Sequence, residues 1–306
     1  MGTPQSTDVT RGQQAMIAWY ERIQANLRVP YESITVPTRF GLTHLIAVGE
    51  KGAPPLVLVQ GLGGNAMLWE PQLIDLSRTH RVFALDVIGQ MGKSAATWLP
   101  YRDNSFSEWL VDTLNALGID QTDLVGLSFG ARLVMRFSAF APQRVRRVAL
   151  LSPIGITRQR LSIIWRILPI AVDLRKPADE TIGDLVHTIL DVPGHRLDEV
   201  CAEAMYIVFK YYRPVSGFKK TVDGLALFLP LSASELQRIT APTLLLVGEH
   251  EQLCDASAVI ARGRRLLSHL VAAELVPKAG HVMNYDSPEY VNSRLIDFFG
   301  SPFSVT

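Results

Sequence analysis

The pentapeptide Gly126-Leu127-Ser128-Phe129-Gly130 is the feature of this sequence that most constrains its fold. An apolar, strand-like run (124–126) precedes Ser128, and a helix-like run (131–137) follows it. A strand that turns directly into a helix holds the residue at the turn in a strained backbone conformation, and side chains at positions 126 and 130 would collide with neighbouring chains. The pattern predicts a serine hydroxyl that projects from the end of a strand, near the N–H groups of the first helical turn.

The rest of the sequence decides whether this serine has a catalytic role, because a strand–turn–helix joint without such a role can have the same sequence pattern. A second apolar strand (242–248) is followed by an acidic cluster of Glu249, Glu251 and Asp255. A third strand (274–277) is followed closely by Gly280 and His281. Serine, acid and histidine thus come in this order along the chain, each after a predicted strand, which is the order of a serine–acid–histidine triad.

With these motifs the chain resembles the α/β-hydrolase superfamily. The run 57–64 followed by Trp69 looks like the family's oxyanion-hole strand and loop, and the runs 81–86 and 89–94 look like the next strand and its glycine-rich loop. Residues from about 30 to 155 and 240 to 300 fit the family. The resemblance implies an α/β fold, with a mostly parallel twisted sheet, helices on both faces and a helical cap insertion.

Periodicity along the chain agrees with this fold class. An amphipathic helix is expected over 13–27, with Ile17, Tyr20, Ile23 and Leu27 on one face, and alternating segments at 32–36 and 41–48 predict an edge hairpin. Apolar strands near 55–60, 81–86, 122–127, 146–152, 242–248 and 271–276 alternate with helical stretches, as in a buried parallel sheet. We therefore expect a hydrolase core over 1–155 and 239–306 and a helical cap domain over 156–238.

The predicted cap is rich in apolar side chains. Its first helical stretch contains Leu161, Ile163, Ile164, Trp165, Ile167 and Leu168 and is apolar on nearly all sides, so we expect it to be buried or to face a cavity. A later stretch carries Tyr206, Phe209, Tyr211 and Tyr212. Part of this set must pack within the cap, and the rest would face a substrate, which predicts a small or medium-sized apolar substrate.

A serine hydroxyl needs a base within hydrogen-bonding reach, and His281 is the histidine with the expected position. The base in turn needs a carboxylate on its other ring nitrogen. Relatives usually carry Gly-x-x-Asp here, and in Gly248-Glu249-His250-Glu251 the aligned acid is Glu251. Asp255, four residues further on, remains the alternative acid. The resemblance also implies that the backbone N–H groups of Leu62 and Phe129 form the oxyanion hole. The family commonly has histidine where this chain has Gln60.

Composition excludes several other classes. A formal net charge of +1 without a basic block argues against a nucleic-acid partner, and no run is long and apolar enough to predict an integral membrane segment. Two cysteines, Cys201 and Cys254, do not make a disulfide framework, so we expect a cytoplasmic protein. No metal-ligand spacing stands out, Val87 replaces a glycine that a P-loop would need, and no cofactor is implied.

These observations predict a cofactor-independent serine hydrolase that cleaves a carboxylic ester or thioester through an acyl-enzyme. Two alternatives remain open at this point: a carbon–carbon bond hydrolase or lyase on the same fold, and a slow-turnover ligand-binding receptor that keeps the triad. Fold alone does not separate them. The oligomeric state is not predicted.

Overall fold

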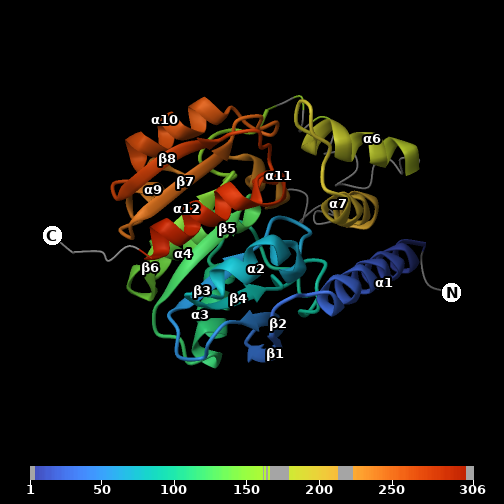
Figure 1. The fold of residues 1–306 in the computed structure, drawn as a ribbon, viewed down its shortest axis with the longest axis horizontal. Coiled ribbons are helices and arrows are strands. Elements are labelled where there is room, and N and C mark those ends of the chain that lie inside the picture. The colour runs from blue at the N-terminus through green and yellow to red at the C-terminus, as the bar shows by residue number, and fades with distance from the viewer. Residues whose placement is uncertain (1–3, 161, 163–164, 166–178, 213–222, 301–306) are drawn as a thin grey trace.

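The computed structural model describes residues 4–160, 162, 165, 179–212 and 223–300. Its centre is an eight-stranded sheet with the strand order β1-β2-β4-β3-β5-β6-β7-β8 (Figure 1). β1 pairs with β2 and β2 pairs with β4 antiparallel, and all other pairs are parallel. The strands are β1 (Tyr31–Thr38), β2 (Gly41–Val48), β3 (Pro55–Val59), β4 (Arg81–Leu85), β5 (Thr122–Leu127), β6 (Val145–Leu151), β7 (Thr243–Gly248) and β8 (Leu270–Val276).

Helices surround this sheet and connect its strands. They are α1 (Pro4–Ala25), η1 (Ala66–Trp69), α2 (Glu70–Leu76), α3 (Ser105–Ala116), α4 (Phe129–Phe140), η2 (Pro142–Arg144), α6 (Asp179–Leu190), α7 (Glu199–Tyr211), η3 (Leu225–Phe228), α9 (Ala233–Gln237), α10 (Ala256–Leu266), α11 (Met283–Asp286) and α12 (Pro288–Gly300). None of the helices in the described ranges combines the length and the apolar character needed to cross a membrane.

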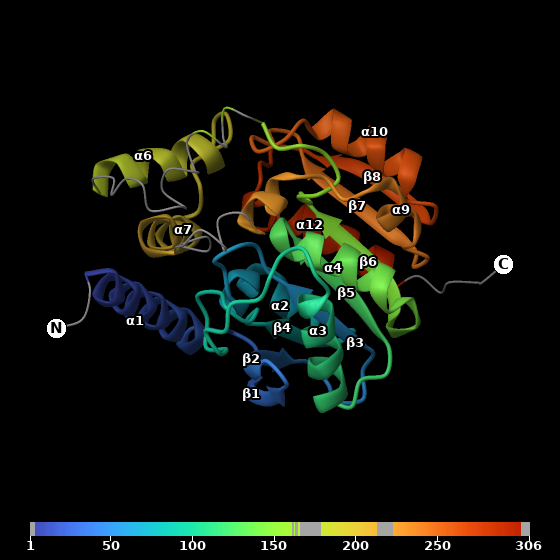
Figure 2. The same cartoon turned by 180° about the vertical axis from the view of Figure 1, so that it is seen from behind.

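The central strands are apolar throughout because both of their faces are covered. Every residue of β4, β5 and β7 is buried. One apolar layer joins the sheet to α1, α2, α7, α11 and α12, and the other joins it to α3, α4, α9 and α10. α2 and α12 lie in front of the sheet in Figure 1, and α3 and α4 lie in front of it in the reverse view of Figure 2. The predicted mostly parallel sheet with helices on both faces is thus confirmed.

Helix α1 differs from its prediction. It begins at Pro4 instead of residue 13. Its buried face consists of Met16, Trp19, Tyr20 and Ile23, whereas Ile17, which was predicted to lie on this face, is only partly buried. The helix packs against α7, where the indole N–H of Trp19 donates to the carbonyl oxygen of Val200 at 3.1 Å. α1 therefore lies beside the insertion (Figure 1), and its Tyr20 also contacts His44 of β2.

The segment between β6 and β7 contributes no strand to the sheet within its described residues. Its helices α6 and α7 pack on each other, and they lie with α1 beyond the C-terminal ends of the central strands (Figures 1 and 2). Of the predicted apolar helix at 161–168, Leu161, Ile163, Ile164, Ile167 and Leu168 fall outside the described residues. Trp165 is 71% exposed, so the expectation of burial is wrong for this side chain.

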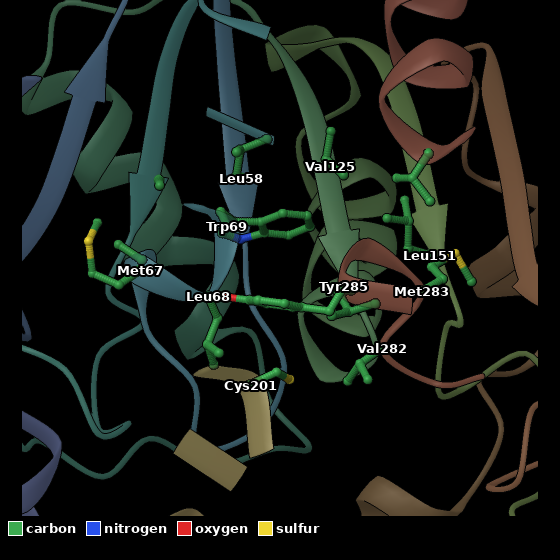
Figure 3. Packing of buried hydrophobic residues seen from close by; sticks show 14 of the residues in the cluster. Leu58, Met67, Leu68, Trp69, Val125, Leu151, Cys201, Val282, Met283 and Tyr285 are labelled. Atoms are coloured by element: carbon green, nitrogen blue, oxygen red, sulfur yellow. The ribbon is translucent and has the colours of Figure 1, made fainter. Parts of the chain in front are cut away.

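A dense apolar layer lies beneath the insertion. Trp69 of η1, Tyr285 of α11 and Cys201 of α7 come together there, next to strand residues Leu58 and Val125 (Figure 3). All of them are buried. This layer fixes α7 and the loop before α11 against the sheet, which positions the residues described next.

Candidate active site

Ser128 stands at the turn from β5 into α4, in the conformation that the pentapeptide predicts. Its φ is 56° and its ψ is −113°, which is a strained region for a residue with a side chain. A methyl group at Gly130 would lie 2.0 Å from the carbonyl oxygen of Val59, and one at Gly126 would lie 2.5 Å from Cα of Ala131. Only glycine fits at both positions, so the chain packing holds Ser128 in this turn.

His281 bridges Ser128 and Glu251. Its Nε2 is 2.8 Å from Ser128 Oγ, and its Nδ1 is 2.9 Å from Oε2 of Glu251. All three residues are buried. An ionised carboxylate can only accept a hydrogen bond, so the ring proton of His281 is on Nδ1, which donates a hydrogen bond to Glu251. Nε2 is then free to accept a hydrogen bond from the serine hydroxyl. The three side chains come from loops after β5, β7 and β8.

The carboxylate of Glu251 is held in its charged form. Burial by itself raises the pKa of this carboxyl group, but the attraction of His281 and hydrogen bonds from His281 and the Leu253 N–H outweigh burial and bring the pKa below its ordinary value. The Leu253 N–H donates to Oε1 at 2.7 Å. Both carboxylate oxygens are therefore engaged, and the negative charge is available to stabilise an imidazolium.

The structure does not bring Asp255, the alternative acid, to His281. Asp255 is exposed and caps the N-terminus of α10, where its Oδ1 accepts from the Ala258 N–H at 2.9 Å. Glu249 is also on the surface and accepts from the Lys278 N–H at 3.1 Å. Among the members of the acidic cluster, Glu251 is the one paired with the histidine.

The oxyanion loop lies beside the nucleophile. A methyl group at Gly61 would lie 3.5 Å from Cβ of Ser128, so the following residue, Leu62, is next to the turn. Phe129 is the first residue of α4, where N–H groups have no partner within the helix. Gln60, the departure from the family pattern, accepts from the Gly61 N–H at 2.8 Å through its side-chain oxygen. It thus holds the loop from one side.

Sequence reasoning missed the residue that holds the loop from the other side. The side-chain oxygen of Gln90, in the loop after β4, accepts from the Gly63 N–H at 2.8 Å. The hydroxyl of Tyr212, directly after α7, donates to the same oxygen at 2.7 Å. The only sequence signals were the glycine-rich run around Gln90 and the aromatic run that ends in Tyr212, and neither predicts that the two residues meet.

A second serine–histidine–aspartate chain exists in the described part of the protein. Ser33 Oγ is 2.8 Å from Nε2 of His44, and Nδ1 of His44 is 2.9 Å from Asp86 Oδ2. Ser33, however, lies within β1 of the edge hairpin and not at the start of a helix. Asp86 also accepts from the N–H groups of Ala66 and Lys93, both at 2.8 Å. Asp86 and His44 are buried, and Asp86 ties the loops after β3 and β4 together, whereas Ser33 is exposed and lacks the helix N-terminus of Ser128.

A further carboxyl group lies near His281. Asp286, at the end of α11, accepts from the Gly280 N–H at 2.8 Å through Oδ2, and its buried Oδ1 has no hydrogen-bond partner among the described residues. Burial raises the pKa of Asp286 to about 6, although the hydrogen bond from Gly280 acts in the opposite direction. The residue thus anchors the histidine loop with a carboxyl group that titrates near neutral pH.

The sequence and the fold are similar to those of known proteins. A sequence model of the α/β-hydrolase fold matches residues 54–176. The chain is 30% identical over 297 residues to an uncharacterized carboxylesterase, nap, of Bacillus subtilis (strain 168), with 95% of each chain covered. It is also 30% identical over 271 residues to carboxylesterase YbfK of the same organism, with 87% of each chain covered.

Among solved structures, a similar one is the crystal structure of carboxylesterase CesB (YbfK) from Bacillus subtilis. The TM-score is 0.80 at 25% sequence identity, and the alignment covers 95% of this chain and 100% of that chain. The likeness therefore covers nearly the whole length of both chains.

Proposed function

The chain belongs to the α/β-hydrolase family and is a serine hydrolase of the carboxylesterase type, and we propose that Ser128, His281 and Glu251 are its catalytic triad. The observation that carries the assignment is the pair of contacts of His281, 2.8 Å to Ser128 and 2.9 Å to Glu251. These are the distances that proton transfer from a serine to a carboxylate-supported imidazole requires.

In the first half of the proposed reaction, Ser128 Oγ attacks the ester carbonyl carbon while its proton moves to Nε2 of His281. The new C–O bond places a negative charge on the carbonyl oxygen, and the N–H groups of Leu62 and Phe129 donate to it. The imidazolium then gives the proton to the leaving alcohol as the old ester bond breaks. The acyl group remains on Ser128.

In the second half, a water molecule takes the place of the alcohol. His281 accepts a proton from this water as its oxygen attacks the acyl carbon, and returns the proton to Ser128 Oγ as the acyl bond to the serine breaks. Glu251 stays ionised throughout and stabilises the imidazolium in both halves. The products are a carboxylic acid and an alcohol, and the enzyme is regenerated.

Substitution of Ser128 tests the assignment directly. Alanine fits the turn and removes only the nucleophile, so Ser128→Ala should reduce hydrolysis of p-nitrophenyl butyrate by about 10⁵-fold or more while the fold is retained. A fluorophosphonate probe should label the wild-type protein on the tryptic peptide that contains Ser128 and leave the variant unlabelled. Retention of more than a few percent of activity would refute the covalent role of this serine.

We further propose that the substrate carries an apolar acyl or alcohol group of small to medium size. The support is the position of α7, which lies directly over the oxyanion loop. A methyl group at Gly63 would come within 2.5 Å of Val208 and 3.2 Å of Tyr212. A substrate bound next to Leu62 therefore meets apolar and aromatic side chains.

A series of p-nitrophenyl esters tests the substrate class. Burial of each methylene contributes about 0.8 kcal/mol, or about fourfold in kcat/KM, until the space is filled. The value of kcat/KM should therefore rise from acetate to butyrate or hexanoate and fall for longer chains. A flat series, or a preference for charged or sugar esters, would contradict the apolar site without affecting the triad.

A further inference from the structure

The side-chain oxygen of Gln90 receives two hydrogen bonds, and they come from different parts of the chain. One is from the backbone N–H of Gly63 in the oxyanion loop, at 2.8 Å, and the other is from the hydroxyl of Tyr212, at 2.7 Å. A carboxamide oxygen has two lone pairs, so both are used here. Gln90 is buried, and such a fully used acceptor holds both of its donors in place.

The position of Gly63 makes this contact relevant to the reaction. Leu62, whose N–H is the proposed oxyanion donor, lies between Gly61 and Gly63. The Gly61 N–H is held by Gln60 and the Gly63 N–H is held by Gln90, each at 2.8 Å. The Leu62 N–H lies in the same peptide plane as the Gly61 carbonyl, and this carbonyl accepts from the Gly64 N–H at 3.1 Å. Gln60 and Gln90 hold the peptide planes directly before and after that plane, and together these contacts set the direction of the Leu62 N–H.

Tyr212 brings the insertion into this arrangement. It is the residue directly after α7, and Val208 on the preceding turn packs on Gly63. Gly63 has a φ of 74°, and a methyl group there would lie 2.5 Å from Val208, so α7 and the loop are in direct contact. Burial raises the pKa of the Tyr212 hydroxyl, which keeps it protonated and able to donate.

Tyr101 connects the same hydroxyl to the second oxyanion donor. Tyr212 is hydrogen-bonded to Tyr101 as well as to Gln90, and the ring of Tyr101 packs edge-on against that of Phe129, with centroids 5.6 Å apart. Phe129 carries the other proposed oxyanion N–H. The Tyr212 hydroxyl is thus linked through Gln90 to the loop that carries the Leu62 N–H, and through Tyr101 to Phe129.

We propose that Tyr212 is a positioning residue that, through Gln90, aligns the Leu62 N–H for the oxyanion and makes this alignment depend on how α7 is docked. The inference rests on the proposed function. Because Tyr212 acts on the oxyanion donor through Gln90, loss of its hydroxyl should affect the transition state more than substrate binding. When α7 lies on the loop, Tyr212 and Gly63 share the oxygen of Gln90, and the donor is aligned.

Tyr212→Phe removes only the hydroxyl and is the primary test. Misalignment of one oxyanion donor should lower kcat for p-nitrophenyl butyrate by about 10- to 30-fold, less than the complete loss of a donor, and leave KM within about twofold. The inhibition constant of an aryl trifluoromethyl ketone, which forms a tetrahedral adduct with the serine, should rise by a similar factor. The inhibition constant of butyrate should not change.

Tyr290→Phe is the matched control. It also removes a hydrogen-bonded tyrosine hydroxyl, one that donates to Glu274 at 3.2 Å on the surface of α12. Its kcat and its inhibition by the ketone should equal those of the wild type. A melting temperature of Tyr212→Phe close to that of this control would separate alignment of the oxyanion donor from a general loss of stability.

A double-mutant cycle shows whether Tyr212 acts through Gln90. Gln90→Met keeps the length of the side chain and removes the acceptor, and we expect it to lower kcat at least as much as Tyr212→Phe. Adding Tyr212→Phe to Gln90→Met should then have no further effect on kcat. Should Gln90→Met not fold, the kinetics of Tyr212→Phe and its ketone inhibition still decide the proposal.

Two results would overturn it: an unchanged kcat in Tyr212→Phe, or additive effects in the cycle. An unchanged kcat with a raised KM would assign Tyr212 to substrate binding. Each of these leaves Ser128-dependent hydrolysis intact. Failure of the proposed function itself would instead appear as activity that survives Ser128→Ala.

Discussion

At the scale of single residues, the choice of carboxylate for His281 follows from backbone geometry more than from the type of acid. The loop after β7 turns Glu251 toward Nδ1, and the Leu253 N–H holds its other oxygen. Asp255 has a shorter side chain and is used as the cap of α10. The sequence limited the candidates for the acid of the triad to these two residues, but it could not show which of them the loop turns toward His281.

Glu251→Gln should lower kcat for p-nitrophenyl butyrate by about 10³- to 10⁴-fold, because a neutral amide does not stabilise the imidazolium and can favour the wrong ring tautomer. Asp255→Asn is the control. Asparagine caps helices as well as aspartate does, so this variant should keep its activity and its stability. Steady-state kinetics of both variants decide the question, and the reverse ranking would transfer the role to Asp255.

Asp286 should make stability depend on pH. Its pKa is raised from 3.8 in an unstructured chain to about 6 in the folded protein, so the folded state binds the proton more tightly. The contribution is therefore fully favourable below pH 3.8 and is lost as the pH rises through about 6. Asp286→Asn, which stays neutral, should be more stable than the wild type by about 1–3 kcal/mol at pH 8.

Urea denaturation at pH 4.5, 6 and 8 measures this difference. The advantage of Asp286→Asn should be small at pH 4.5, grow up to pH 6 and then level off. A difference that is the same at all pH values would show that Asp286 acts through packing or hydrogen bonding and not through its charge.

At the scale of elements, the contact between α1 and α7 is the least expected feature. Residues 4–12 have no apolar periodicity, so the sequence predicted a helix only from residue 13. Gly12 is buried against α7, and a methyl group there would lie 2.3 Å from Cβ of Tyr211. The missing side chain lets the two helices approach closely, and a local pattern cannot reveal such a contact.

Gly12→Ala should therefore destabilise the protein, although alanine normally stabilises a helix by about 1 kcal/mol relative to glycine. We expect a loss of about 1–3 kcal/mol, since the new methyl group forces the helices apart. Gly183→Ala in α6 is the matched control, because nothing in the described part of the protein lies within 4 Å of its added methyl group. Gly183→Ala should stabilise, as measured by urea denaturation, and stabilisation by both variants would contradict the α1–α7 contact.

For the molecule as a whole, the inner strands of the sheet could be predicted from the sequence because they are buried on both faces and therefore rich in apolar residues. Ser128, Glu251 and His281 could be expected to lie together because each follows a predicted strand, and the carboxyl ends of parallel strands meet at one edge. The contacts that hold the oxyanion loop in place could not be predicted from the sequence. Gln90 and Tyr212 are 122 residues apart, and only the packing of α7 onto the loop brings them together.

The division of the chain into core and cap remains a prediction. α6 and α7 stand apart from the sheet as a cap would, but α1, from the other end of the chain, packs with them. The body of helices next to the active site is thus built from an N-terminal helix and an internal insertion together. This arrangement places α7 between α1 and the oxyanion loop.

Hydrolysis through an acyl group on Ser128 requires an acylated intermediate, and this intermediate can be detected. Wild-type protein mixed with excess p-nitrophenyl butyrate and quenched in acid within the first turnover should carry one butyryl group on the peptide that contains Ser128. Release of p-nitrophenol should show a burst of up to one equivalent per chain if deacylation is slower. Steady hydrolysis with no acylated peptide at any quench time, together with an active Ser128→Ala, would contradict the account.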